Sequence, residues 1–211
     1  MKVVMVGLDF AGKTSLINRL IHDYNYNEII NIEPIIGANI EEYQSKWLNL
    51  ILWDLGGQKD NIVEYLESPE KFFVQLDVLI FVIDSQDDIR YNEAAHYLKD
   101  LTGILTFLNE KPYIVVLLNK VDSDIVDDPD FQIKLEYLMD KIYNIFNNSQ
   151  KSWNFELIPT SIYNFYSTEP EIAKSIKRIF SKEKSERKLD TLVDIEKTLE
   201  KILNIKIFNV N

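Results

Sequence analysis

Residues 7–14 follow the pattern G-x-x-x-x-G-K-[ST], which constrains the fold of this chain more than any other stretch. Gly7 and Gly12 let the backbone turn and approach an anion without a Cβ in the way. Successive N–H groups of such a loop point inward and form a nest for an anion. Lys13 adds a positive charge beside the phosphates, and the Thr14 hydroxyl can ligate Mg²⁺. The motif predicts a P-loop that binds a nucleoside triphosphate.

The residues on either side of the loop have the patterns that a P-loop requires. Residues 2–6 are typical of a buried strand, and residues 15–21 are typical of a helix. The phosphates are therefore expected to lie at a positively charged helix N-terminus. The residues expected to bind the nucleotide here are Gly7, Asp9, Ala11, Gly12, Lys13, Thr14 and Ser15.

Strand and helix patterns alternate along the chain, which predicts an α/β P-loop NTPase fold. The expected sheet has six strands, is mostly parallel and carries helices on both faces. Strands are expected at 2–6, 40–43, 47–53, 78–83, 113–118 and 155–159, with a turn at 44–46. Helices are expected at 15–21, 60–76 (broken near Ser68 and Pro69), 92–108, 131–146 and 171–180.

Two amphipathic patterns in the second half of the chain predict buried helix faces. The first is expected to bury Ile133, Leu135, Leu138, Met139, Ile142 and Ile145. The second follows a charged linker at 181–185, and its apolar residues are Leu189, Leu192, Val193, Leu199, Ile202 and Leu203. Residues 205–208 are a candidate short strand. We therefore expect a domain at 1–180 and a C-terminal helical appendage at 181–211.

A second motif begins at Asp54, directly after the apolar residues 51–53. A carboxylate at a strand end can hold Mg²⁺, usually through water. Gly57 lets the chain cross the γ-phosphate, and the Gln58 amide follows where it can orient a water. The alternatives are a strand-end cap for Asp54 and partner binding without catalysis for Gln58. The candidate metal ligands are Thr14 and Asp54, and the candidate catalytic residues are Lys13 and Gln58.

The third motif, Asn119-Lys120-x-Asp122, follows an expected strand. The Asp122 carboxylate can accept hydrogen bonds from guanine N1–H and N2–H₂, whereas adenine has neither donor and would leave the charge unpaired. Backbone N–H groups near Ser161 and Ile162 can meet guanine O6. These residues predict that the nucleotide is a guanine nucleotide.

Together these motifs resemble the Ras-superfamily small GTPases, and most closely their Arf-like branch. The similar segments are the P-loop at 7–14, switch I and the interswitch start at 34–41, switch II at 53–58, and residues 79–85 with 92–94. The segments around 65–73 and 160–163 are more similar to Rag GTPases.

The resemblance covers residues 1–180 and implies a protein that binds GTP and GDP with Mg²⁺ and hydrolyses GTP slowly as a molecular switch. It also implies effector and regulatory partners at switches I and II and the interswitch. The alternative is a nucleotide-bound interaction module with little or no hydrolysis.

The sequence departs from the Arf pattern at its N-terminus, where the amphipathic helix and the myristoylated Gly have no counterpart and residue 2 is Lys. We therefore expect no intrinsic membrane anchor. The net charge of −11 argues against nucleic acid as a partner. The absence of cysteine fits a reducing compartment, so a cytoplasmic protein that reaches a membrane through a partner is expected. Residues 189–208 are expected to dock on the chain's own domain, in a dimer or on a partner.

Several other residues have structural interpretations. His22 and His96 are expected to be solvated helix residues. Trp47, Trp53 and Trp153 are expected in the core or on a partner surface. The acidic run at 122–130 lacks the spacing of an EF-hand and is expected to be a solvated loop.

The switch I Thr of the family, which binds Mg²⁺ and senses the γ-phosphate, is replaced by Ile35, and no Thr occurs between Thr14 and Thr102. Mg²⁺ is expected to keep a water there or to accept Glu33 instead. Because a switch shifts only by the differential affinity of its ligand, the coupling of switch I to GTP should be weak. Ile35→Thr should strengthen Mg²⁺ dependence and slow hydrogen exchange at 30–40 in the GTP state. Strong, Mg²⁺-dependent protection of 30–40 by a GTP analogue alone, already present in the natural protein, would contradict this.

Overall fold

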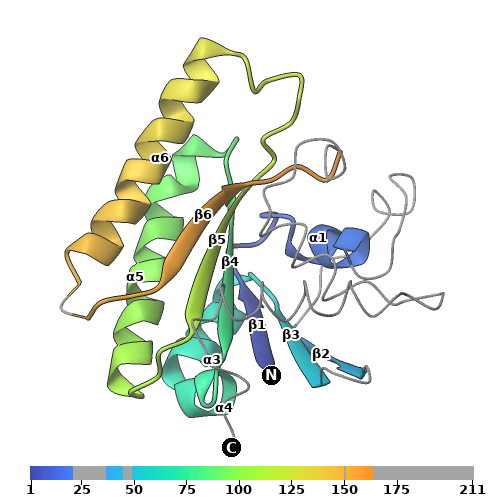
Figure 1. The fold of residues 1–211 in the computed structure, drawn as a ribbon, viewed down its shortest axis with the longest axis vertical. Coiled ribbons are helices and arrows are strands. Elements are labelled where there is room, and N and C mark those ends of the chain that lie inside the picture. The colour runs from blue at the N-terminus through green and yellow to red at the C-terminus, as the bar shows by residue number, and fades with distance from the viewer. Residues whose placement is uncertain (21–36, 45–48, 150, 164–211) are drawn as a thin grey trace, which may run out of the picture.

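A computed structural model describes residues 1–20, 37–44, 49–149 and 151–163 (Figure 1). Its strands are β1 (Lys2–Val6), β2 (Ala38–Gln44), β3 (Asn49–Leu55), β4 (Val78–Asp84), β5 (Tyr113–Asn119) and β6 (Phe155–Pro159). Its helices are α1 (Lys13–Leu20), α3 (Lys59–Glu67), α4 (Pro69–Phe73), α5 (Tyr91–Phe107) and α6 (Pro129–Asn147), with a 3₁₀ turn η1 (Asp88–Arg90). None of the helices in these residues is both long and apolar enough to cross a bilayer.

The strands form one six-stranded sheet in the order β2-β3-β1-β4-β5-β6. β2 pairs antiparallel with β3, and the other pairings are parallel. The register places Asp54 opposite Met5 and Asn119 opposite Asp84. The chain runs outward from β1 in both directions, so the carboxyl end of β1 is a topological switch point, where α/β sheets bind ligands. The expected mostly parallel, six-stranded α/β fold is confirmed.

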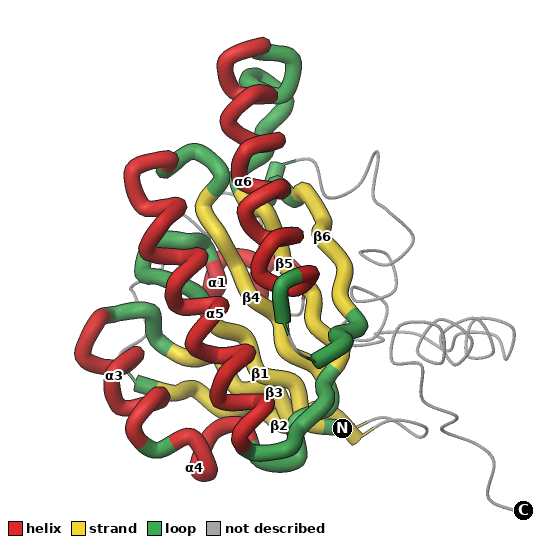
Figure 2. Tube along the Cα trace, turned by 90° about the vertical axis from the view of Figure 1, so that its left-hand side faces the viewer, coloured by secondary structure: helices red, strands yellow, loops and turns green. Residues whose placement is uncertain are grey.

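Helices cover both faces of the sheet, as Figures 1 and 2 show. On one face, α3 to α6 pack over alternate strand residues such as Val4, Phe81 and Val116. On the other face, Leu16 and Ile17 of α1 pack over the intervening residues, such as Met5. Strands β1, β4 and β5 are buried on both faces. Their sequences are therefore continuous apolar runs, in which apolar and polar residues do not alternate.

The expected break in the helix at 60–76 is confirmed. α3 ends before Ser68, and Pro69 occupies the first turn of α4. Proline fits there because the first N–H groups of a helix have no intrahelical partner. α6 begins in the same way, with Pro129 in its first turn, and the Asp128 side chain accepts a hydrogen bond from the N–H of Asp130.

One predicted core residue is wrong. Ile133 of α6 is 65% exposed, whereas Phe131 and Phe146, which were not in the predicted face, are buried with Leu138 and Ile142. Residues 131, 138 and 142 fall within about 40° of one another at 100° per residue, and residue 133 lies on the opposite side of the helix.

Other predictions of the sequence analysis concern residues outside the described ones. These are Ile35, Trp47, most of the turn at 44–46, the helices at 171–180 and 189–203, the linker at 181–185, the strand at 205–208 and His22. The domain boundary at residue 180 stays a prediction for the same reason. Among the other residues considered, Trp153 is buried and His96 is exposed on α5, with its ring Nδ1 near the carbonyl of Asn92.

Candidate functional site

The loop from Gly7 to Gly12 joins the carboxyl end of β1 to the start of α1, and its glycines have no room for side chains. Gly7 has φ of +149°, and a Cβ there would lie 2.2 Å from the carbonyl oxygen of Val82 on β4. Gly12 has φ of +92°, and a Cβ there would lie 2.4 Å from the Asn119 side-chain nitrogen. These two positions require glycine for both conformation and space.

Asn119 connects the P-loop to the third motif. It is 1% exposed at the end of β5, and its Nδ2 donates to the carbonyl oxygen of Ala11 at 2.8 Å. The Thr160 hydroxyl donates to Asn119 Oδ1 at 3.3 Å from the loop after β6. A single buried amide therefore joins three loops at one edge of the sheet.

Lys13, the first residue of α1, and Asp54, near the carboxyl end of β3, are buried charged groups. The Lys13 ammonium donates to the carbonyl oxygens of Gly7 and Leu8 at 2.9 and 2.8 Å. Burial lowers the pKa of Lys13 to about 8, an effect that the carboxylates of Asp54 and Asp9 oppose. Burial raises the pKa of Asp54 to about 6, against the opposing effects of Lys13 and a hydrogen bond from Thr14. Both groups are in surroundings that penalise their charged forms, which is common at functional sites.

Thr14 and Asp54, the two predicted metal ligands, are in contact. The Thr14 hydroxyl donates to Asp54 Oδ2 at 3.0 Å. Asp54 Oδ1 is buried and has no hydrogen-bond partner among the described residues. A hydroxyl and an unsatisfied carboxylate oxygen are hard oxygen donors of the type that Mg²⁺ prefers. The donor set therefore fits a divalent cation.

The segment after β3 lies against the P-loop. The Gly57 carbonyl accepts a hydrogen bond from the N–H of Asp9 at 2.9 Å, and a Cβ on Gly57 would lie 2.3 Å from the Asp9 nitrogen. The N–H of Gly56 and the hydroxyl of Tyr65 both donate to the carbonyl of Gly37, at 2.7 and 3.0 Å. The side-chain oxygen of Gln58 accepts from the Asn61 amide at 2.7 Å. The start of β2, the end of β3 and α3 thus form one connected unit beside the phosphate loop.

Most of the remaining predicted site residues lie beyond β5 and β6, whereas Ser15 lies in α1. The Asp122 carboxylate accepts hydrogen bonds from the Ser161 hydroxyl and, at 3.2 Å, from the Gln86 amide. The Lys120 ammonium pairs with Asp84 at 2.5 Å, and Lys120 has φ of +66°. Ile162 is half-buried and packs against the core on the α1 side, and Ser15 is half-buried in the first turn of α1.

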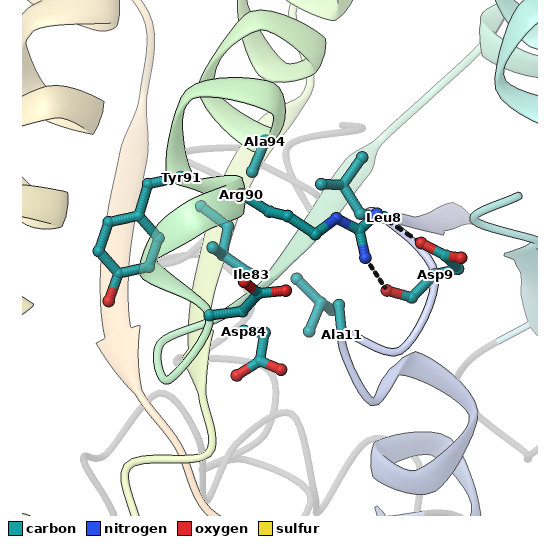
Figure 3. Close-up of a pocket in the computed structure, with 10 residues that line it drawn as sticks. Leu8, Asp9, Ala11, Ile83, Asp84, Arg90, Tyr91 and Ala94 are labelled. Carbon is teal, nitrogen blue, oxygen red and sulfur yellow. Dashed lines mark hydrogen bonds and ion pairs between the residues drawn. The ribbon is translucent and has the colours of Figure 1, made fainter. Parts of the chain in front are cut away.

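Arg90 was not predicted to contact the P-loop, but it does (Figure 3). Its guanidinium, in the 3₁₀ turn before α5, donates to the side chain and the carbonyl of Asp9 at 2.5 and 3.3 Å. Its Nε pairs with Glu93 at 2.9 Å. The Asp9 carboxylate contacts Arg90, and the contact of Asp9 with the nucleotide stays a prediction. The contact spans 81 positions, and no local sequence signal could have revealed it.

Phe10 is a second residue that the sequence analysis missed. It lies at the tip of the P-loop with φ of +59° and is 72% exposed. A bulky side chain in the left-handed region is unfavourable by roughly 1–2 kcal/mol. The loop therefore holds Phe10 in a left-handed backbone conformation that its side chain disfavours.

Comparisons with known proteins agree with this geometry. Residues 1–155 match the model of the ADP-ribosylation factor family. ADP-ribosylation factor-like protein 5 of Caenorhabditis elegans is 35% identical over 126 residues, which cover 57% of this chain and 62% of that protein. The chain thus spans less than two thirds of the length of that relative. ADP-ribosylation factor-like protein 1 of Drosophila melanogaster is 32% identical over 158 residues, which cover 71% of this chain and 79% of that protein.

A solved structure has the same fold. The Arl6 BBS3 small GTPase from Trypanosoma brucei, with the bound nucleotide analogue GppNp, superposes with a TM-score of 0.58 at 20% identity. The superposition covers 77% of this chain and 87% of that one.

Arg90→Lys should loosen the P-loop while keeping the positive charge, because an ammonium cannot form the two-pronged contact of a guanidinium. Hydrogen bonds to charged groups contribute about 1.5–3 kcal/mol, and partial exposure of this pair reduces that to about 1 kcal/mol, or roughly fivefold in exchange rate. Hydrogen exchange of residues 9–11 measures the effect. Lys134→Gln, which removes a neighbouring pair to Asp88 without touching the loop, is the control. Equal exchange at 9–11 in wild type and Arg90→Lys would show that Arg90 does not support the loop.

Proposed function

The chain belongs to the ADP-ribosylation factor family of small GTP-binding proteins, and we propose that it binds GTP and GDP with Mg²⁺ and hydrolyses GTP slowly as a molecular switch. The observation that carries the proposal is the contact of Asn119 with Ala11, below the side-chain-free position at Gly12. It joins the loop expected to bind phosphate to the motif expected to bind guanine. The spacing between these two protein segments is therefore fixed before a nucleotide binds.

Phosphate binding is assigned to the loop and its lysine. The Lys13 ammonium donates hydrogen bonds to the carbonyl oxygens of Gly7 and Leu8, which are uncharged and therefore weak partners for a buried ammonium. Phosphate oxygens carry full negative charge and would be stronger partners, so bound phosphate should return the pKa of Lys13 toward its ordinary value. Backbone N–H groups of the loop and the first turn of α1, including Ser15, would complete the anion site.

Thr14 and Asp54 would hold Mg²⁺. The unsatisfied oxygen of Asp54 supports this role, since a cation beside it would offset the burial that now raises its pKa. Bound Mg²⁺ would neutralise negative charge that develops on the phosphate oxygens during transfer to water. The hydroxyl of Thr14 already contacts the carboxylate, so both ligands lie together.

Hydrolysis is expected to be slow because the chain offers no free arginine near the expected phosphate site. No Arg occurs between Arg19 and Arg90, and the guanidinium of Arg90 is engaged by Asp9 and Glu93. An arginine finger contributes about 10³–10⁵ in rate where one is present. A regulatory partner would have to supply it.

The surface for such partners is proposed to include β2 and β3. Ile40 on β2 and Ile51 on β3 are 49% and 38% exposed, and the half-buried Trp53 pairs across the strands with Ile40. These side chains alternate with the buried Leu50 and Leu52, so they share the other face of the hairpin. This part of the interswitch can offer apolar contacts beside the segment that holds Gly57 and Gln58.

Asp122→Asn should weaken GDP and GTP binding and favour xanthine nucleotides, because the Asn NH₂ group would face the guanine 2-amino group donor to donor, whereas the 2-oxo group of xanthine can accept its hydrogen bond. Loss of a charged hydrogen bond costs about 1.5–3 kcal/mol, which corresponds to roughly 10- to 150-fold in affinity. Calorimetry with GDP, ADP and XDP measures the change, and Asp124→Asn, at an exposed position in the same loop, is the control. Equal affinity of the natural protein for ADP and GDP would refute the assignment of guanine.

Gln58→Leu tests the hydrolysis itself and distinguishes the second candidate function, an interaction module that holds GTP without turnover. The hydrogen bond from Asn61 to Gln58 favours that alternative, because it restrains the Gln58 side chain that would otherwise orient a water. Single-turnover hydrolysis by the natural protein should be well below about 1 s⁻¹. In Gln58→Leu the hydrolysis rate should fall a further ~10²-fold, because the attacking water is no longer positioned, while GTP affinity stays unchanged.

Asn61→Ala serves as the companion variant, because it removes the amide that holds Gln58. A switch that hydrolyses GTP should keep or gain rate in Asn61→Ala. Equal rates in all three proteins would assign the chain to the interaction module.

A further inference from the structure

Gln86 lies in the turn between β4 and η1, and its side chain contacts two residues of the motif expected to bind guanine. Its Nε2 donates to the carbonyl oxygen of Lys120 at 2.9 Å and to Asp122 Oδ2 at 3.2 Å. A side-chain amide nitrogen carries two N–H donors, so these contacts use both of them. The sequence pattern of the motif does not include Gln86, which therefore has no role in the site described above.

The Asp122 carboxylate receives one hydrogen bond on each of its oxygens. The Ser161 hydroxyl donates to Oδ1, and Gln86 donates to Oδ2. An aspartate side chain restricts the rotation of its own carboxylate only weakly, so its partners decide where the two oxygens lie. Because the two donors come from different loops, one after β4 and one after β6, together they fix that rotation.

These two hydrogen bonds still leave acceptor capacity for a base. An ionised carboxylate offers about four lone-pair sites, which is about two on each oxygen. Ser161 and Gln86 each use one of them, on different oxygens. Each oxygen of Asp122 therefore keeps a site, and guanine has two neighbouring donors, N1–H and N2–H₂. A two-pronged contact of this kind depends strongly on the orientation of the carboxylate.

The backbone of the turn that carries Gln86 is also attached to the guanine motif. The N–H of Gln86 donates to Asp84 Oδ1 at 3.0 Å, and the other oxygen of that carboxylate pairs with the Lys120 ammonium at 2.5 Å. The N–H of Ser85 donates to the carbonyl of Asn119 at 2.9 Å. The turn therefore holds Gln86 at a fixed place beside the motif.

Lys120 needs this support because its backbone is in the left-handed region, with φ of +66°. That conformation is unfavourable for a residue that has a Cβ. Asp84 holds the ammonium of Lys120, and Gln86 holds its carbonyl. Since Asp122 follows only two residues later, Gln86 can act on it in two ways, directly through the carboxylate and indirectly through the backbone.

We propose that Gln86 is a positioning residue for guanine recognition, which orients the Asp122 carboxylate for N1–H and N2–H₂ of the base. The proposal rests on the proposed function, since it concerns the same site. Hydrogen bonds to charged groups are among the stronger ones, but Gln86 is exposed, and solvent weakens the bond. Its loss should therefore reduce guanine affinity about fivefold.

Gln86→Met in the full-length protein tests the proposal, because methionine is similar in length but has no N–H donor. Competition of GDP and inosine diphosphate (IDP) against a fluorescent GDP derivative measures both affinities. Because IDP lacks only the 2-amino group, the ratio of the GDP to the IDP affinity reports the hydrogen bond to N2–H₂. We expect this ratio to fall about fivefold in Gln86→Met. In the control Gln132→Met it should not change, since Gln132 is also exposed and its Nε2 donates to a backbone carbonyl outside the motif, that of Val126 at 3.0 Å.

A double-mutant cycle separates the direct contact of Gln86 with Asp122 from its contact with the backbone. In the Asp122→Ala background the direct contact is absent, so Gln86→Met should change GDP affinity less than about twofold. An equal loss in both backgrounds would assign Gln86 to support of the backbone alone and overturn the proposal.

Two further outcomes of the same measurements would also overturn it. One is an unchanged ratio of GDP to IDP affinity in Gln86→Met. The other is tighter GDP binding by Gln86→Met, which would show that Gln86 competes with guanine for the Asp122 carboxylate. A natural protein that binds ADP as tightly as GDP would refute the proposed function itself, and that result is separate from the effect of Gln86.

Discussion

The site depends on one buried hydrogen bond, between the Asn119 amide and the Ala11 carbonyl. Asn119 ends β5 and Ala11 lies in the loop after β1, so the bond joins segments 108 residues apart across the switch point of the sheet. It is possible only because Gly12 leaves the space that the amide occupies. Thr160 satisfies the other end of the amide, which keeps the network free of an unpaired buried group. The P-loop, the end of β5 and the loop after β6 are thereby joined through one side chain.

The two charged side chains at the centre of the site are destabilised by burial. Lys13 and Asp54 are both almost fully buried, and burial moves the pKa of each toward its neutral form. Their mutual attraction offsets this only in part, and one Asp54 oxygen stays without a partner among the described residues. A site of this kind gains more from a phosphate and a cation than a solvated site would, because the ligand satisfies groups that water does not reach.

The P-loop is supported from two sides at Asp9. Arg90, in the turn before α5, pairs with the Asp9 carboxylate and with Glu93, and the N–H of Asp9 donates to the carbonyl of Gly57. The loop is thus clamped between α5 and the segment after β3.

The sequence by itself determined the P-loop, the mostly parallel six-stranded α/β sheet and the family, because the glycine spacing and the apolar runs are local patterns that each have few physical solutions. It also placed the break at Pro69, where the missing N–H permits only a helix start. It was wrong about Ile133, since a two-residue offset on a helix turns a side chain away from the sheet. Only the tertiary structure decided that Asp9 faces Arg90 and that Asn119 fits over Gly12. Those contacts join residues far apart in the chain, and their geometry follows from how the helices pack on the sheet rather than from any pattern within a single element.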